Sequence, residues 1–183
     1  MKEVSMQCSS DLPRTMIRHN GMKLSLEVIV ASLADQSTVR YFVKNEDITQ
    51  WESDPDEIVL ELLQSPEYDI STGARQNCIV HSTSWRFEPH QTIVLTYFVY
   101  SDLPMFSKNN GKLLSLHDAT ISVSDDPAKP RPARIDEEHI VTHGIRHISH
   151  LVKEGSQNIL RILTPDSIQA FQSIDSLLAG RLS

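Results

Sequence analysis

The chain has 183 residues, of which 39% are hydrophobic and 22% are charged, and its formal net charge is −7. This length and composition are typical of a globular domain and exclude collagen, coiled-coil and disordered chains. The negative charge argues against non-specific nucleic-acid binding, which requires clustered Lys and Arg side chains.

Targeting signals are the next feature that the sequence addresses. Residues 1–14 contain no apolar core followed by a small-residue cleavage site, so we expect no secretory signal. The longest apolar runs, such as Ile93–Tyr100, are too short to cross a bilayer. Cys8 and Cys78 are far apart in the sequence, which favours reduced thiols over a disulfide framework. These features predict a cytoplasmic protein without a membrane partner.

Alternating apolar residues begin after the turn at Asn20-Gly21. Apolar side chains at every second position from Met22 to Val30 predict a half-buried strand. A short loop at 32–37 separates it from a second alternating run, which spans 39–43. The short separation predicts an antiparallel hairpin.

A helix is predicted within an acidic segment, residues 45–74, that contains nine acidic residues and no Lys or Arg. Asp54 is suited to cap the helix, and Pro55 is suited to its first position. The apolar side chains between 58 and 63 form one face of this helix. Ser65-Pro66 ends it, because the residue before a proline avoids the helical region.

Three further strands are predicted before the chain becomes helical. The first spans Cys78–Phe87, and strict alternation places His81 and Trp85 on the same face. The second, Thr92–Tyr100, is apolar on both faces and is therefore expected in the centre of the sheet. The third is short and spans Ala119–Val123.

A segment with three prolines within six residues, 125–132, is predicted to be an extended linker. We therefore interpret the chain as a single domain, 1–183, with a strand-rich portion at 22–124 and a helical portion at 133–183. In the helical portion, a first helix is expected from Asp136 to about Lys153. The run 159–163 is either a strand or a helical turn, and a final helix starts at Thr164-Pro165.

These elements together predict an α+β fold. We expect a mainly antiparallel sheet of four or five strands, one intervening helix, and two C-terminal helices packed on one face of the sheet. The sequence contains no glycine-rich phosphate loop, no nucleophile elbow, no CxxC pair and no HExxH motif. These absences lower the expectation of an ATP-, NAD- or acyl-transfer enzyme.

The first C-terminal helix is unusual because four of the eight histidines of the chain lie within it. His139, His143, His147 and His150 fall within an arc of about 80°, at 100° per residue, and Asp136 lies in the same direction. The apolar residues of the helix point the other way. Gly144, near its middle, either interrupts the helix or marks a close approach of another part of the chain.

Three interpretations of this histidine face remain open. It is a solvated polar surface, a site for metal or acid–base chemistry, or an interface whose strength depends on pH. A metal site would use His139, His143, His147, His150 and Asp136 with zinc or iron.

The functional hypotheses follow from these interpretations. The first is a non-enzymatic binding or regulatory domain that forms a homodimer or binds a small molecule. The alternative is a metal-dependent hydrolase or oxygenase that uses the helix at 136–154.

Overall fold

The protein is described by a computed structural model, which covers residues 22–48, 54–65, 70, 73, 76–103, 111–120 and 134–175. The elements in chain order are β1 (Lys23–Asp35), β2 (Thr38–Ile48), α1 (Pro55–Gln64), β3 (Ile79–Glu88), β4 (Thr92–Tyr100), β5 (Lys112–Ser115), α3 (Glu137–Lys153), α4 (Gln157–Leu160) and α5 (Pro165–Ser173). The predicted α+β class is therefore confirmed. The linker predicted at 125–132 lies outside the described residues.

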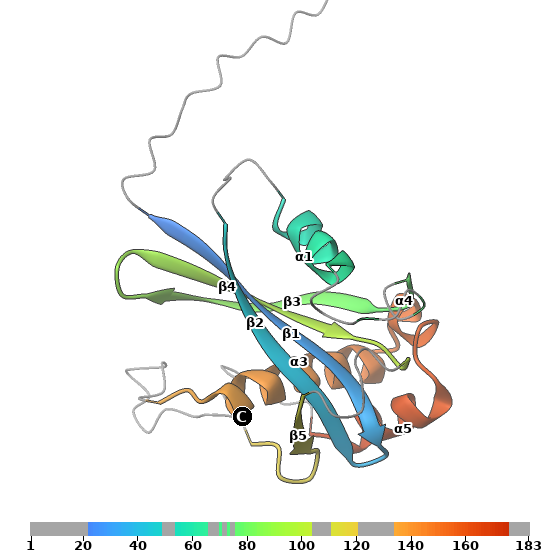
Figure 1. The fold of residues 1–183 in the computed structure, drawn as a ribbon. Helices are drawn as coiled ribbons and strands as arrows, with labels where there is room; N and C mark the ends of the chain where they lie inside the picture. Colours follow the sequence, from blue (N-terminus) through green and yellow to red (C-terminus); the bar gives the residue numbers. More distant parts are fainter. Residues whose placement is uncertain are drawn as a thin grey trace, which may run out of the picture.

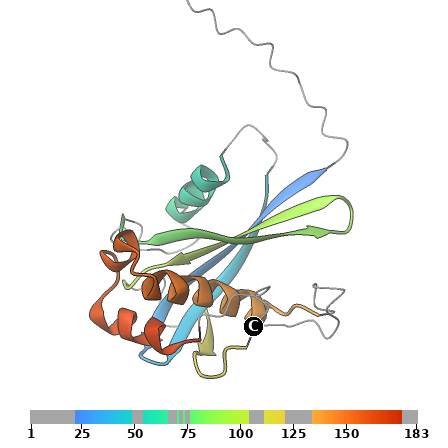
Figure 2. The ribbon, with the colours of Figure 1, turned by 180° about the vertical axis from the view of Figure 1, so that it is seen from behind.

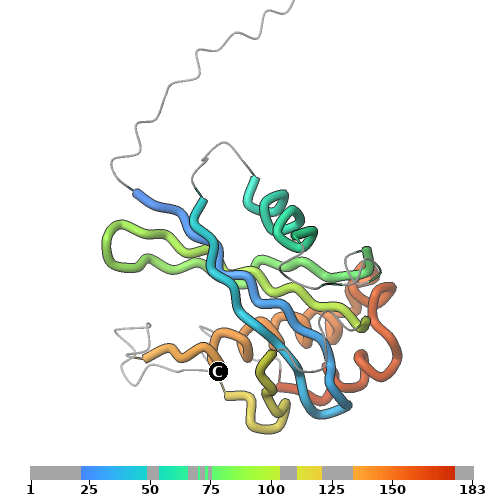
Figure 3. The backbone as a smooth tube through the Cα atoms, in the orientation of Figure 1, coloured from blue at the N-terminus to red at the C-terminus, as the bar shows by residue number. Residues whose placement is uncertain are grey.

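The five strands form one mixed sheet in the order β3-β4-β1-β2-β5. The pairs β1–β2, β3–β4 and β2–β5 are antiparallel, and β1–β4 is parallel. The sheet is thus mostly antiparallel, as predicted, with one parallel pair at its centre. The hairpin of β1 and β2 is long and strongly twisted, and the β3–β4 turn lies beside the start of β1 (Figure 3).

Helices cover both faces of the sheet (Figures 1 and 2). On one face, α3 and α5 pack against an apolar cluster that includes Ile29, Phe98 and Tyr100. On the opposite face, α1 packs against a second cluster that includes Leu26 and Val99. The predicted arrangement of two C-terminal helices is partly confirmed, because α3 and α5 pack on one face of the sheet and a third, short helix, α4, partly overlaps the run at 159–163.

The central strand β1 corrects one prediction. Its residues from Leu26 to Leu33 are almost all buried on both faces, so it is not the half-buried strand that alternation indicated. Alternation fails here because the strand lies in the middle of a sheet with helices on both sides. The polar residues Ser25 and Glu27 are buried with the apolar ones, at 8% and 5% exposure.

Local signals at the helix ends are confirmed for α1 and α5. The Asp54 carboxylate accepts a hydrogen bond from the Asp56 amide, and Pro55 is the first residue of α1. The Thr164 side chain accepts a hydrogen bond from the Ser167 amide, and Pro165 is the first residue of α5, so this helix begins where predicted. The helix ends at Ser173, and residues 176–183 lie outside the described residues.

The structure contains one short strand that the sequence does not predict. This strand is β5, at Lys112–Ser115, and it pairs with β2. Ala119 and Thr120 are not in a strand, and 121–123 lie outside the described residues. A strand of four residues has too few positions for alternation to be recognised, which explains the error. In the described part of the chain, no helix is long and apolar enough to cross a membrane.

Candidate functional site

Helix α3 is continuous through Gly144, so the two alternatives for this residue are resolved. The helix runs from Glu137 to Lys153, and Gly144 lies directly on the ring of Phe98 in β4. A Cβ atom at this position would lie 2.2 Å from Cδ2 of Phe98. Gly144 therefore permits the close approach of the helix to the sheet, and this contact sets where the histidines of α3 lie.

Two of the four α3 histidines meet a third histidine from the edge strand β3. The Nδ1 atom of His147 lies 3.1 Å from Nε2 of His81, and Nε2 of His147 lies 3.2 Å from Nε2 of His143. The centroids of the three rings are 5.2 and 4.6 Å apart along the same path. All three side chains are half-buried. We call this group the histidine cluster, defined as His81, His143 and His147.

The histidine cluster is held in its neutral form. Burial lowers the pKa of His81 and of His143, and the positive charge of Arg146 lowers the pKa of His143 further. Burial and the neighbouring His143, His81 and His150 lower the pKa of His147 to about 4. A hydrogen bond to the backbone of Thr83 partly opposes the shift of His143.

One set of tautomers satisfies every contact in this cluster. The backbone of Thr83 raises the pKa of His143, which is the effect of a carbonyl oxygen that accepts from a ring N–H. His147 can then donate from Nε2 to His143, and His81 can donate from Nε2 to His147. The three rings form a hydrogen-bonded chain that joins β3 to α3. This assignment follows from the hydrogen-bond network.

The remaining members of the predicted metal set lie elsewhere on α3. Nδ1 of His139 accepts a hydrogen bond from the Asp136 amide at 3.0 Å, so His139 caps the start of its own helix. The Asp136 carboxylate accepts from Arg134 at 2.8 Å. His150 is half-buried and is the last of the three neighbouring histidines that lower the pKa of His147. Sequence periodicity therefore identified His143 and His147 but missed His81, which approaches from 66 residues earlier in the chain.

A β-bulge at Thr83 corrects the prediction for β3. The register with β4 shifts between Ser82 and Ser84, so the side chains after the bulge change face. His81 is opposite Phe98 on the α3 side of the sheet, whereas Trp85 is opposite Leu95 on the α1 side. The expectation that His81 and Trp85 share one face is therefore wrong. Strict alternation has no means of anticipating an inserted residue.

After the bulge, β3 presents two aromatic side chains at the edge of the sheet. Trp85 is 69% exposed and Phe87 is 51% exposed, and they are opposite Leu95 and Ile93 of β4. We call this surface the edge aromatic pair, defined as Trp85 and Phe87.

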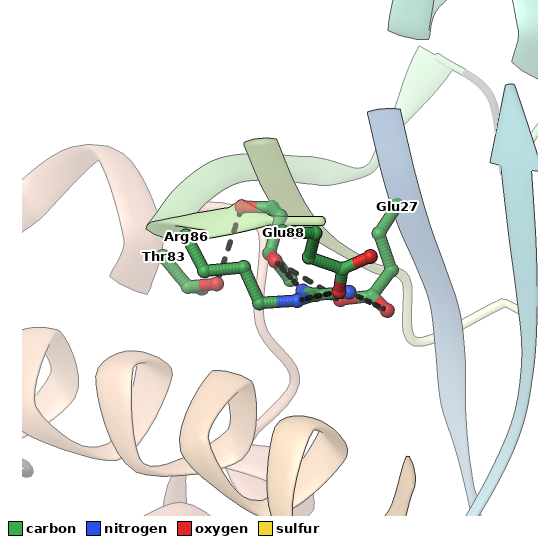
Figure 4. A network of polar contacts seen from close by, with 5 residues as sticks. Glu27, Thr83, Arg86 and Glu88 are labelled. Atoms are coloured by element: carbon green, nitrogen blue, oxygen red, sulfur yellow. Dashed lines mark hydrogen bonds and ion pairs between the residues drawn. The ribbon is translucent and has the colours of Figure 1, made fainter. Parts of the chain in front are cut away.

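The α3 side of β3 carries a buried ion pair (Figure 4). The Arg86 guanidinium donates to both carboxylate oxygens of Glu27, at 2.8 and 2.9 Å, and its Nε donates to Glu88 at 2.7 Å. Thr96 also donates to Glu27 at 3.0 Å. The Glu27 side chain is 7% exposed and that of Arg86 is 23% exposed, and these contacts raise the pKa of Arg86 against the effect of burial. Arg86 thus neutralises a carboxylate in the central strand.

The interface between the sheet and the C-terminal helices is filled by side chains. Phe98, Ile145, Ile148 and Phe171 are fully buried there. The hydroxyl of Tyr100 donates to Asp102 at 2.8 Å and lies 3.0 Å from the Ser167 hydroxyl, which ties β4 to α5.

A comparison with models of protein families and with curated proteins finds no match to this chain. Within the described ranges, no group of three or more His, Cys, Asp or Glu residues could hold a metal ion. In the histidine cluster the reason is visible, because His147 faces its two partners with different ring nitrogens.

Proposed function

We propose that the protein is a binding domain that acts as a homodimer through β3, the edge strand of the described sheet. The observation that carries this proposal is the exposure of Trp85 on a strand that has only one neighbour, β4, in the described sheet. An edge strand presents backbone N–H and C=O groups that can pair with another strand. Large exposed aromatic side chains are typical of the centres of protein interfaces.

The bulge at Thr83 supports a particular pairing of the two copies. It leaves Ser84–Glu88 as the regular part of the strand beyond the bulge, and Arg86 is the middle residue of this part. If two such segments pair antiparallel about Arg86, Trp85 of each copy lies opposite Phe87 of the other. Cross-strand aromatic pairs of this kind each contribute about 0.2–1 kcal/mol beyond an alanine pair.

The charge of the edge segment also favours a second copy as the occupant. Ser84–Glu88 contains one Arg and one Glu, so the segment has no net charge although the chain carries −7. Arg86 is already paired with Glu27 and Glu88, so two Arg86 residues meeting near a two-fold axis are each neutralised. The edge at β3 is thus a place where two acidic molecules can approach.

Size-exclusion chromatography with light scattering over a range of protein concentrations tests this proposal. The wild-type chain is expected to have the mass of a dimer, and Trp85→Ser is expected to shift it to a monomer. Leu113→Ser is the matched control, because Leu113 is 57% exposed on the opposite edge strand β5. A monomeric wild-type chain at all concentrations, or equal dissociation by Leu113→Ser, would contradict the proposal.

A further inference from the structure

We propose that the histidine cluster is an acid-sensitive clamp that holds the β-bulge of β3 against α3 and thereby controls the pairing of two β3 edges. The control of pairing rests on the homodimer proposed above, whereas the clamp is a property of a single chain. The histidine face of α3 is not itself the interface in this arrangement, because His147 contacts His81 of β3 within the same chain.

Helix α3 contacts β3 at the bulge. His147 lies 3.1 Å from His81, which is two residues before Thr83, and His143 interacts with the backbone of Thr83 itself. The Thr83 hydroxyl donates to the Thr96 carbonyl at 3.2 Å, and this hydrogen bond ties the bulge to β4. The inserted residue is therefore held by the sheet and by α3 at the same time.

The bulge determines the direction in which the edge aromatic pair points. A shift of one residue in the pairing of a strand moves its side chains to the other face of the sheet. Because the register shifts between Ser82 and Ser84, Trp85 lies on the α1 side, where it is 69% exposed. Release of the bulge leaves Ser84–Glu88 without a fixed register, so the edge that a second copy pairs with is no longer defined.

Added protons break the contacts of the clamp. In the tautomers described above, Nε2 of His81 donates to Nδ1 of His147, so a proton on this Nδ1 atom places two donors against each other. A change of tautomer in His81 accommodates the first proton. A second proton puts positive charges on two rings whose centroids lie 5.2 or 4.6 Å apart, and like charges at such distances repel.

The charged groups around the cluster do not compensate for these protons. On α3, Arg146 lowers the pKa of His143, and His150 adds to the lowering of the pKa of His147. Burial acts in the same direction on all three rings. Three carboxylates on this side of the sheet are each paired with an arginine, namely Glu27 of β1 and Glu88 of β3 with Arg86, and Asp175 after α5 with Arg146.

Proton linkage gives the expected size of the effect. The pKa of His147 is about 4 in the closed cluster, and a ring released to solvent returns to about 6.5. The open form therefore takes up a proton that the closed form does not, and the equilibrium constant for opening rises by up to about 30-fold between pH 7.5 and pH 5. His147 is half-buried, so solvent screening reduces this factor, and we expect at least about fivefold.

Hydrogen exchange of the backbone amides of residues 82–84, corrected for the intrinsic effect of pH, measures the opening of the bulge. The full-length Trp85→Ser chain is used, so that dimerisation does not contribute. Protection of these amides is expected to fall at least about fivefold between pH 7.5 and pH 5, and less than about twofold when His147→Gln is added. His150→Gln is the matched control, because His150 lies on the same helix outside the cluster, and it is expected to keep the full pH dependence.

Light scattering of the chain that retains Trp85, at the same two pH values, measures the effect on the dimer. The net charge of −7 becomes less negative at pH 5, which favours association, so His147→Gln serves as the reference for this effect. The ratio of the dimer Kd at pH 5 to that at pH 7.5 is expected to be higher in the wild type than in His147→Gln. Circular dichroism at both pH values establishes that each chain is folded, and His143→Gln replaces His147→Gln if the latter is not.

The two measurements separate the clamp from the dimer. Protection of residues 82–84 that does not fall with pH, or that falls equally in His147→Gln, would overturn the clamp. Equal ratios of Kd in the wild type and in His147→Gln would overturn its control of the dimer. A wild-type chain that is monomeric at both pH values would instead refute the pairing of β3 edges, and the exchange of the Trp85→Ser chain would still decide the clamp.

Discussion

The contact between Gly144 and Phe98 gives the sharpest prediction for the fold. In Gly144→Ala, the new Cβ would lie 2.2 Å from Cδ2, 2.6 Å from Cγ and 3.0 Å from Cβ of Phe98. Two carbon atoms in favourable contact lie about 3.5–4.0 Å apart, so ring or helix must move by roughly 1 Å. Rotation of the ring does not relieve the contact with Cβ of Phe98, and this side chain is fully buried.

The expected magnitude follows from two opposing effects. Alanine in place of glycine in a helix interior stabilises by about 1 kcal/mol. Overpacking of a well-packed core costs about 1–3 kcal/mol, and the contacts here indicate the upper part of this range. We therefore expect Gly144→Ala to lower the free energy of unfolding by about 2 kcal/mol. Urea denaturation followed by circular dichroism measures this difference.

Two further variants separate crowding from backbone effects. In a Phe98→Ala background the ring is absent, so Gly144→Ala should no longer lower the free energy of unfolding. It should instead raise it slightly, because alanine has the higher helix propensity. Gly155→Ala meets nothing within 4 Å but has a φ of +72°, so its cost comes from backbone strain and is insensitive to Phe98→Ala. A stability of Gly144→Ala equal to or above that of the wild type would refute the close approach of α3 to β4.

Three other predictions concern the ion pair, the histidine cluster and the β3–β4 turn. Arg86→Met leaves Glu27 as a buried unpaired carboxylate and should cost about 3 kcal/mol in urea denaturation, whereas the double replacement of Arg86 and Glu27 by Met should recover most of it. The pKa of His147 is lowered to about 4, so the unfolded chain binds a proton between about pH 6.5 and pH 4 that the folded chain does not. The contribution of His147 to the free energy of unfolding is therefore fully present above about pH 6.5 and is lost as the pH falls toward 4. The expected loss is about 1–2 kcal/mol after allowance for solvent screening. His147→Gln should reduce this loss, and an unchanged difference between unfolding at pH 7 and pH 4.5 would contradict the lowered pKa. Gln91 has a φ of +59°, so Gln91→Gly should raise the free energy of unfolding by about 0.5–1 kcal/mol, and a lower value would argue against the left-handed conformation.

The sequence predicted the elements whose signals are local. Asp54-Pro55 and Thr164-Pro165 each combine a side chain that accepts from the next helical turn with a proline that fits the first position. Gly155 after α3 adopts the positive φ expected beyond a helix C-terminus. The hairpin of β1 and β2 follows from two apolar runs with few residues between them. In each case the physical cause lies within a few residues of its effect.

The candidate site was predicted only in part. The 3.6-residue period of α3 brings His143 and His147 to one face, and this could be calculated from the residue numbers alone. It also placed His139 and His150 on that face, although His139 instead caps its own helix. The role of each histidine depends on what lies opposite it, and helix periodicity has no information about the opposing element.

What the sequence by itself determined was the class of the fold, the starts of α1, α3 and α5, and the direction of the histidine face. Only the tertiary structure decided which residues meet across the sheet. The parallel pairing of β1 with β4 brings Glu27 to Arg86, 59 residues later. The bulge at Thr83 turns Trp85 outward on one face while His81 stays on the other. The close contact of Gly144 with Phe98 then fixes the position of α3, in which His147 contacts His81. These contacts join residues far apart in the chain, and their geometry depends on strand order and register, which local patterns do not encode.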